Sequence, residues 1–394
     1  MGDKICCPIF MKMPQERCCG CEACVQICPQ RALKLTESGE GYLYPELIKE
    51  KCVQCNRCER VCPMLKIFPE DNADEVYYGI SHRNTDVLLS SASGGLFTFL
   101  YSKFIERYPE GYVCGAIYSD GFEKVKHLVS NSLEDIQKMR SSKYFQSHKE
   151  FAYEQVEAKL KKNEAVFFTG TPCEVAALKL FLGKNYEKLW TLDFVCKGGG
   201  SPKILTDYVR YIKSKFDAEI IYLNMRYKWR ELDNWIPQFV CFKFDNGKNY
   251  LREFYNTELG IGFQILQRKS CKECPFCEKK HYADFTIGDF HGISDKWKCF
   301  NRLGTSVMIL NSSFAKKFWE QIDKSEINWE IITKKDVYEN NRNPVDSRRK
   351  LLVKNLNKYN DAVIAIRKSI NMKQKIKMVM PVKLLRKVTT WRKN

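Results

Sequence analysis

The sequence of 394 residues has no apolar run close to the roughly 18 residues that a membrane-spanning helix needs. Its first ten residues, MGDKICCPIF, lack the apolar core of a signal peptide. Cys6 also stands where a myristoylation signal has Ser or Thr. These absences indicate a soluble, intracellular protein, and we expect a cytoplasmic location.

Histidine is scarce, and the five histidines stand at positions 82, 127, 148, 281 and 291. None lies in a pattern that indicates a catalytic triad. Cysteine, in contrast, is abundant, with 19 residues. The chain is too long for a small disulfide-stapled secreted domain, so the cysteines indicate metal ligands or redox groups.

Acidic residues are nearly absent from the C-terminal end. The chain has 65 Lys and Arg against 47 Asp and Glu, a formal charge of +18, but residues 348–394 hold 15 of the basic residues and one acid, Asp361. The remaining 347 residues are therefore close to neutral. We expect no nucleic-acid partner, because the charge belongs to the end of the chain and not to its body.

This basic tail, residues 346–394, is predicted to form helices at 361–377 and 381–393. In the second helix the apolar residues recur near helical spacing and the basic residues lie largely elsewhere. Such a helix suits peripheral contact with an anionic membrane surface. A solvated or partner-docked extension explains the pattern equally well.

Two copies of one cysteine run are the strongest signal. Cys18, Cys21, Cys24 and Cys28 precede Pro29, and Cys52, Cys55, Cys58 and Cys62 precede Pro63 with the same spacing. This is the run of bacterial ferredoxins, in which each copy gives three thiolates to one 4Fe–4S cluster and the fourth to the other. The crossed scheme assigns Cys18, Cys21, Cys24 and Cys62 to one cluster, and Cys52, Cys55, Cys58 and Cys28 to the second. Cys19 falls outside it.

The surrounding residues complete a ferredoxin domain at 1–69. Residues 32–35 and 41–44 read as short strands, and Pro45 is expected to lead a short helix into Lys51. An acidic linker follows at 70–75.

From residue 76 to 345 the pattern predicts a mixed α/β domain. Strands are expected at 76–80, 112–118, 165–168 and 189–195, with capped helices after Thr171 and Ser201. In such a sheet, turns after parallel strands bind ligands. The turns at 93–95, 170–171 and 198–201 therefore either line a nucleotide site or are plain glycine turns.

A β-rich stretch follows, with strands at 220–226, 236–244 and 248–254. Cys271 and Cys274 then form a CxxC pair, which is compatible with zinc, a redox dithiol or a cluster. Cys277 and His281 stand close enough in sequence to complete a zinc site.

Together these segments resemble one family. Ser93-Gly94-Gly95, Ser142-Lys143-Tyr144, Gly170-Thr171-Pro172-Cys173, Asp193 to Cys196, Cys271-x-x-Cys274 and Gly288-Asp289 occur in one order over residues 18–312. The order is similar to that of the coenzyme F-420 hydrogenase/dehydrogenase beta-subunit family, here with a fused ferredoxin domain. One turn departs from the family pattern, because Lys197 stands where many bacterial relatives have His after the cysteine.

The resemblance implies FAD and a third 4Fe–4S cluster. The third cluster's ligands would be Cys173, Cys196, Cys271 and Cys274, with Cys277 as a substitute. Lys143 would lie near the flavin or the substrate. Contacts with FAD would come from Ser93, Gly94, Gly95, Ser142, Tyr144, Gly170, Thr171, Gly198 and Asp289.

These parts predict an iron–sulfur flavoprotein oxidoreductase. Clusters carry single electrons and a flavin converts them to hydride chemistry on a small organic substrate. The partner would be a ferredoxin or a deazaflavin coenzyme. The alternative is an electron-relay subunit of a larger redox complex without substrate chemistry of its own.

Overall fold

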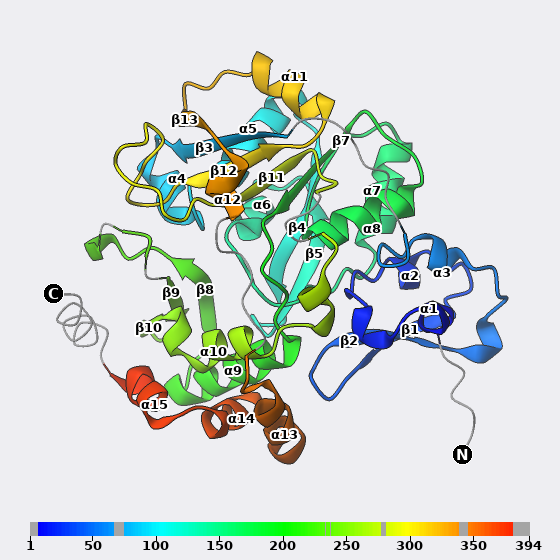
Figure 1. Ribbon diagram of the computed structural model, residues 1–394, viewed down its shortest axis with the longest axis vertical. Coiled ribbons are helices and arrows are strands. Elements are labelled where there is room, and N and C mark those ends of the chain that lie inside the picture. Colours follow the sequence, from blue (N-terminus) through cyan, green and yellow to red (C-terminus); the bar gives the residue numbers. More distant parts are fainter. Residues whose placement is uncertain are drawn as a thin grey trace.

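The structure is a computed structural model that describes residues 7–66, 75–232, 234–236, 238–276, 281–338 and 346–380. Cys277, most of the predicted linker and the predicted helix at 381–393 lie outside the described residues. The described part comprises a small N-terminal module, a large mixed sheet covered by helices, and a three-stranded sheet beside the C-terminal helices (Figure 1). The predicted mixed α/β fold is confirmed.

The N-terminal module is built on one antiparallel strand pair, β1 (Leu33–Glu37) and β2 (Leu43–Leu47). The prediction of a short helix after Pro45 was wrong. Pro45 lies inside β2 opposite Leu35, and only a 3-10 turn, Lys49–Lys51, follows. A two-stranded sheet has only edge strands, where Pro is tolerated. Three short helices complete the module: α1 (Pro8–Lys12), α2 (Ala23–Gln26) and α3 (Arg57–Arg60).

The large sheet has the strand order β13-β3-β12-β11-β7-β6-β4-β5. Strands β4, β6, β7 and β11 run parallel to one another, so their carboxyl ends meet at one edge. β12 is antiparallel to β11, which brings the start of β12 to the same edge. The bounds are β3 (Val76–His82), β4 (Tyr112–Ser119), β5 (Lys124–Ser130), β6 (Val166–Thr169), β7 (Leu189–Phe194), β11 (Phe285–Asp289), β12 (Ser306–Leu310) and β13 (Ile327–Ile332).

Helices cover both faces of this sheet because its central strands alternate apolar side chains between two cores. Phe167 joins the core under α5 (Leu96–Arg107) and α11 (Ser313–Gln321). Val166 and Phe168 join the core under α7 (Ala152–Lys161) and α8 (Pro172–Leu182). Strands buried on both faces are expected to read as continuous apolar runs, as residues 165–168 do. Two short helices, α4 (Thr85–Ser90) and α6 (Leu133–Met139), also contact the large sheet, at β3 and β4.

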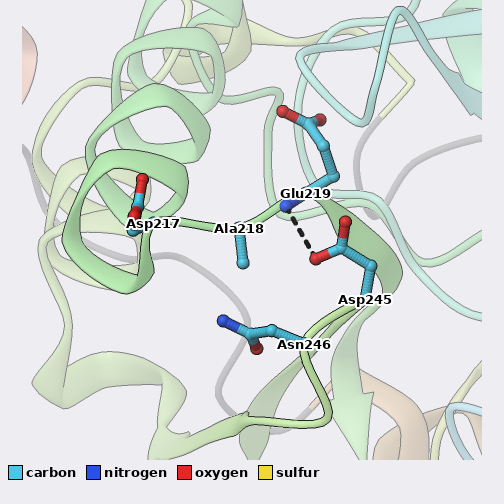
Figure 2. A pocket seen from close by; sticks show the side chains of 5 residues that line it. All are labelled: Asp217, Ala218, Glu219, Asp245 and Asn246. Atoms are coloured by element: carbon cyan, nitrogen blue, oxygen red, sulfur yellow. Dashed lines mark hydrogen bonds between the residues drawn. The ribbon is translucent and has the colours of Figure 1, made fainter.

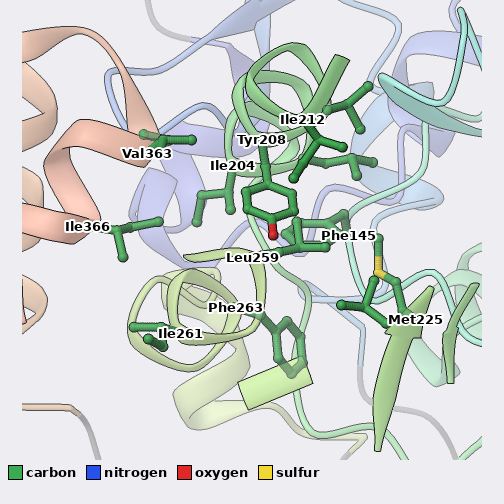
Figure 3. Packing of buried hydrophobic residues seen from close by; sticks show 14 of the residues in the cluster. Phe145, Ile204, Tyr208, Ile212, Met225, Leu259, Ile261, Phe263, Val363 and Ile366 are labelled. Atoms are coloured by element: carbon green, nitrogen blue, oxygen red, sulfur yellow. The ribbon is translucent and has the colours of Figure 1, made fainter. Parts of the chain in front are cut away.

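A second sheet has the order β10-β9-β8 and packs on helices from distant parts of the chain. A tight turn joins β9 to β10, in which Gly247 has φ +78° and its N–H donates to the carbonyl of Phe244. Figure 3 shows the large apolar cluster here, in which Met225, Tyr208, Phe263 and Ile366 converge from four elements. The bounds are β8 (Ile220–Tyr227), β9 (Phe239–Phe244), β10 (Asn249–Glu253), α9 (Pro202–Phe216) and α10 (Glu258–Ile265).

The first part of the basic tail packs into this cluster. Two helices, α14 (Ala362–Ser369) and α15 (Met372–Val379), replace the single helix predicted at 361–377, and an additional helix, α13 (Arg349–Tyr359), precedes them. The break follows Ser369, and Asn371 accepts a hydrogen bond from the N–H of Gln374 to start α15. Leu352, Leu356 and Ile366 are buried, so residues 349–370 form part of the core. Among the described residues, no helix is long and apolar enough to cross a membrane.

Candidate functional site

Two cavities in the N-terminal module gather the eight ferredoxin-type cysteines. The outer cavity is lined by Cys28, Cys52, Cys55 and Cys58. The inner cavity is lined by Cys18, Cys21, Cys24 and Cys62, and also by Cys19, which the crossed scheme leaves out. Each cavity thus collects three thiols of one run and the fourth of the other, which is the grouping that the crossed scheme requires. Cluster ligation by these thiols stays a prediction.

The two runs have matching backbone geometry. Glu22 and Asn56 each follow the second cysteine of a run, have φ of 65° and 57°, and precede the short helix that carries the third cysteine. The left-handed residue reverses the chain within one turn, which lets three thiols surround one cavity. At the fourth cysteine of the first run, the N–H of Ala32 donates to Cys28 Sγ at 3.2 Å.

A single-metal site is a poor match for these thiols. Within the described ranges, no three Cys, His, Asp or Glu side chains are grouped so that they could hold one metal ion. Tetrahedral zinc with bonds of about 2.3 Å draws its thiolates tightly together, whereas the thiolates of a 4Fe–4S cluster bind four different irons. His281, the candidate zinc ligand, contacts both carboxylate oxygens of Asp193 through Nδ1 at 3.0 Å.

A third thiol group, Cys173, Cys196, Cys271 and Cys274, lies at the carboxyl edge of the large sheet. Cys173 stands in the first turn of α8 after β6, and Cys196 follows β7. Burial raises the pKa of the Cys196 thiol well above its usual value, and the neighbouring Cys271, Cys173 and Cys274 add to the rise. The sheet therefore brings together four cysteines that are spread over 102 residues of sequence.

Hydrogen-bond donors surround the third thiol group. The N–H of Gly198 donates to Cys196 Sγ at 3.4 Å, and Thr171 Oγ1 lies 3.1 Å from Cys173 Sγ. Gln267 Nε2 is buried and has no hydrogen-bond partner in the described part of the chain. The Gln267 amide faces Gly198, where an added Cβ would lie 3.0 Å from its oxygen. An unpaired buried donor beside four thiols fits a cluster, because cluster sulfurs accept such bonds.

Arg268 and Cys19 join the N-terminal module to the third thiol group, and we call their contacts the seam. Cys19 makes side-chain hydrogen bonds with both Cys21 and Cys173. Arg268 is 2 % exposed and donates to the carbonyls of Cys18 at 2.6 Å and Leu43 at 2.9 Å. The seam therefore sets the inner cavity against the third thiol group.

A charged group lies at the same sheet edge as the third thiol group. Arg226 of β8 donates to Asp289 Oδ2 at 2.7 Å, to Tyr144 Oη at 3.1 Å and to the carbonyl of Ala92 at 2.8 Å. Burial acts to raise the pKa of Asp289, but the charge of Arg226 holds it below its usual value. Lys228 donates to the carbonyl of Ser93 at 2.6 Å, and burial lowers its pKa to about 7.

Comparison with known families matches both parts of the chain. Residues 17–65 match the 4Fe-4S dicluster domain, and residues 163–335 match the family that comprises the C-terminal part of the coenzyme F420 hydrogenase/dehydrogenase beta subunit. Residues 163–335 thus carry the C-terminal domain of this beta-subunit family, and a 4Fe-4S dicluster domain precedes it at residues 17–65. The family predicted from the motifs is thus confirmed.

The chain was also compared with curated proteins and with solved structures. No curated protein matched the chain. Among solved structures, the chain resembles a chain in the structure of the F420-reducing NiFe hydrogenase complex from Methanosarcina barkeri. The sequence identity is 16% and the TM-score is 0.45. That match covers 77% of this chain and 93% of the other.

The predicted flavin residues of this beta-subunit domain divide into two places. Ser93 and Gly94 bond to Thr305 and Ser306 at the start of β12, on the side of Arg226. A Cβ at Gly94 would lie 2.4 Å from the carbonyl of Ile80, so the turn needs glycine for packing. Tyr144, Ser142 and Asp289 belong to the same side. Gly170, Thr171 and Gly198 lie instead beside the third thiol group.

Lys143, the predicted catalytic residue, directs its amino group into backbone. Nζ donates to the carbonyls of Lys138 at 2.8 Å, Arg140 at 2.7 Å and Ser141 at 3.2 Å. Burial lowers the pKa of this amine to about 7. A lysine saturated by three carbonyls holds a loop in shape, and here that loop presents Tyr144, whose φ is +58°.

The sequence interpretation missed Arg226, Lys228 and Arg268. Each is a basic residue in a strand or turn without a recognisable motif, and its partners lie 63 to 250 residues away. The only local signal was proximity, since Arg268 stands three residues before Cys271. The network of Lys149, Glu174 and Glu22 was also missed, although Glu22 and Glu174 adjoin predicted cluster ligands.

An open acidic hollow lies apart from all these groups. Figure 2 shows it between the end of α9 and the β9–β10 turn, where Glu219 N–H donates to Asp245 Oδ1 at 3.1 Å. Its lining comes from Asp217, Ala218, Glu219, Asp245 and Asn246, and holds neither thiols nor buried cations.

Proposed function

We propose that the protein is an iron–sulfur flavoprotein oxidoreductase that passes electrons between a ferredoxin or deazaflavin partner and a small organic substrate. Two ferredoxin-type 4Fe–4S clusters, a third cluster and FAD would be its cofactors. The observation that carries the proposal is the order of thiol sites: outer cavity, inner cavity, seam, third thiol group. When bound, the clusters supply one-electron transfer and the flavin exchanges one electron for two-electron chemistry.

The thiols of the chain would hold the clusters. Cys28, Cys52, Cys55 and Cys58 would bind the outer cluster, and Cys18, Cys21, Cys24 and Cys62 the inner one. Cys173, Cys196, Cys271 and Cys274 would bind the third. The N–H groups of Ala32 and Gly198 would donate to cluster thiolates and so raise the reduction potential of the sites.

The charged group around Arg226 would bind the flavin at the sheet edge. Arg226 is held by Asp289 and Tyr144, so its charge is fixed in place beside the carboxyl ends of β7 and β11. A fixed cation favours an anionic ligand or an anionic reduced state. We infer that Arg226 supplies this charge, and that Lys143 is a positioning residue for Tyr144.

Anaerobic purification followed by iron, sulfide and flavin analysis tests the proposal. Three clusters require about 12 iron atoms per chain, together with one FAD. The variant C173S should lose roughly a third of the iron, because one cluster loses a ligand. The control variant C241S, at a buried cysteine of β9 outside all three thiol groups, should keep it all. Zinc in place of iron, or a chain without flavin, would overturn the proposal.

Measuring substrate turnover by the purified chain distinguishes the proposed oxidoreductase from the alternative, an electron-relay subunit. A relay subunit without substrate chemistry would accept electrons into its clusters and flavin, yet would reduce no small organic substrate unless a partner subunit is added. Substrate reduction by the purified chain alone would exclude the relay.

A further inference from the structure

The two cavities of the N-terminal module differ in exposure. In the inner cavity Cys21, Cys24 and Cys62 are all below 9 % exposed, and the seam covers this side. In the outer cavity Cys55 is exposed and the other three thiols are half-buried. α2, on the inner side, packs against α7 and α8, whereas α3 packs against α1 and α2 (Figure 1).

The segment 49–66, which carries Cys55, exposes an apolar side chain and several basic ones, and we call this surface the outer face. Val53, next to Cys52, is 62% exposed. The basic residues Lys49, Lys51, Arg57 and Arg60 are all exposed. Residues 49–66 hold five basic and two acidic residues, a net of +3.

The basic groups of the outer face are uncommitted. Among the described residues, Lys49, Lys51, Arg57 and Arg60 form no ion pair. Of the two acids in the segment, Glu59 is paired with Lys12 of α1, which leaves only Glu50 exposed and unpaired. Unpaired exposed cations around a redox group attract a partner of opposite charge and speed its encounter.

We propose that the outer face is the docking surface for an acidic one-electron carrier protein, and that electrons enter the chain there. This deepens the proposed function and rests on it. Such a carrier would give one electron to the cluster held by the outer-cavity thiols and would itself be oxidised, with no bond made or broken and no proton moved. Electrons would then pass inward, because among the described residues the seam contacts of Cys19 and Arg268 join the inner cavity to the third thiol group.

A protein carrier fits this face better than a deazaflavin coenzyme. A reduced deazaflavin delivers a hydride, which carries two electrons, whereas a 4Fe–4S cluster accepts one. One exposed apolar side chain among exposed cations also matches the small, transient interfaces of electron-transfer encounters.

The double variant R57E/R60E tests the docking surface. Its matched control, K317E/K354E, makes the same charge change at exposed lysines on α11 and α13. Reduction of the holoprotein is followed by stopped flow at low salt, with a reduced, net-acidic bacterial two-cluster ferredoxin as donor. We expect R57E/R60E to be reduced about 10-fold more slowly than wild type or control. The difference should vanish at high salt, where the charges are screened.

Two arms keep this result separate from the proposed function. Dithionite reduction and iron content should be the same in all three proteins, which shows intact clusters. The rate at which reduced deazaflavin coenzyme reduces the holoprotein should be the same in all three proteins. Equal rates with the ferredoxin in all three proteins, or no reduction of wild type by the ferredoxin while dithionite works, would overturn the docking surface alone. Loss of iron or flavin from wild type would instead overturn the proposed function.

Discussion

Lys143 shows how a buried cation can serve structure. Its folded pKa of about 7 lies below the usual lysine value because of burial. Between that value and the pKa of about 10.4 for an unfolded lysine, the unfolded chain binds one more proton than the folded chain. The free energy of unfolding therefore rises with pH in this window, and below pH 7 the buried charge lowers it by a constant amount.

The variant K143M tests this account. Relative to wild type, its unfolding free energy should lose a slope of about 1.4 kcal/mol per pH unit between pH 7 and 9. Urea unfolding of both proteins at several pH values measures it. K138M, on an exposed lysine of the same segment, is the control and should keep the wild-type slope. Identical slopes in K143M and wild type would contradict the assignment.

Arg226 and Asp289 form the second residue-scale test. Removing the guanidinium in R226Q leaves a buried carboxylate without its cation, which costs about 3–5 kcal/mol in the free energy of unfolding. The double variant R226Q/D289N removes both charges and should recover a large part of that loss. Flavin content measured on the same samples should fall in both variants. Full flavin content in R226Q would show that this cation does not hold the flavin.

At the scale of elements, helix α14 joins tail to core. Ile366 is 1% exposed inside the apolar cluster, whereas Ile364, two residues earlier, is 42% exposed. Truncating a buried isoleucine to alanine costs about 2–5 kcal/mol, and truncating an exposed one usually less than 0.5 kcal/mol.

The pair I366A and I364A therefore tests whether the tail is structural. Thermal unfolding should show a clearly lowered midpoint for I366A and a midpoint close to wild type for I364A. If both variants unfolded like wild type, residues 349–370 would be an appendage, as the charge count alone suggested.

The strands and cysteines were predictable for different reasons. The segments 165–168 and 189–195 are short and mostly apolar, as strands buried on both faces of a sheet are, so these strands could be predicted from the sequence. The spacing of the two cysteine runs is local and repeated, so its grouping into two cavities followed as well. Pro45 was wrongly predicted to lead a helix, because an edge strand tolerates proline and a central strand does not. Arg226 and Arg268 could not be found, since their contacts depend on how distant segments meet.

At the scale of the whole molecule, Arg268 ties two modules together. R268M removes its hydrogen bonds to the Cys18 and Leu43 carbonyls and should loosen the inner cavity from the third thiol group. R367M, which removes an arginine paired with Glu258 in α10, is the matched control. We expect full iron in both variants, but a weakened magnetic interaction between reduced clusters in R268M only.

Electron paramagnetic resonance of the reduced proteins measures that interaction, and stopped-flow flavin reduction gives a second readout. R268M should pass electrons to the flavin more slowly than R367M when dithionite reduces both. Equal spectra and equal rates in the two variants would show that the seam has no part in electron transfer.

The placement of α14 also has a consequence in time. The ferredoxin-type module is complete by residue 66, but the apolar cluster of the main domain is not closed until Ile366 and Ile370 are made. At synthesis rates of 5–20 residues per second, about 300 residues separate these events by roughly 15–60 s. Until Arg268 has been made, in the earlier part of that interval, the thiols of the inner cavity are not yet covered by the seam. Biogenesis of the holoprotein thus has a natural window for iron–sulfur delivery, which begins to close when the seam forms.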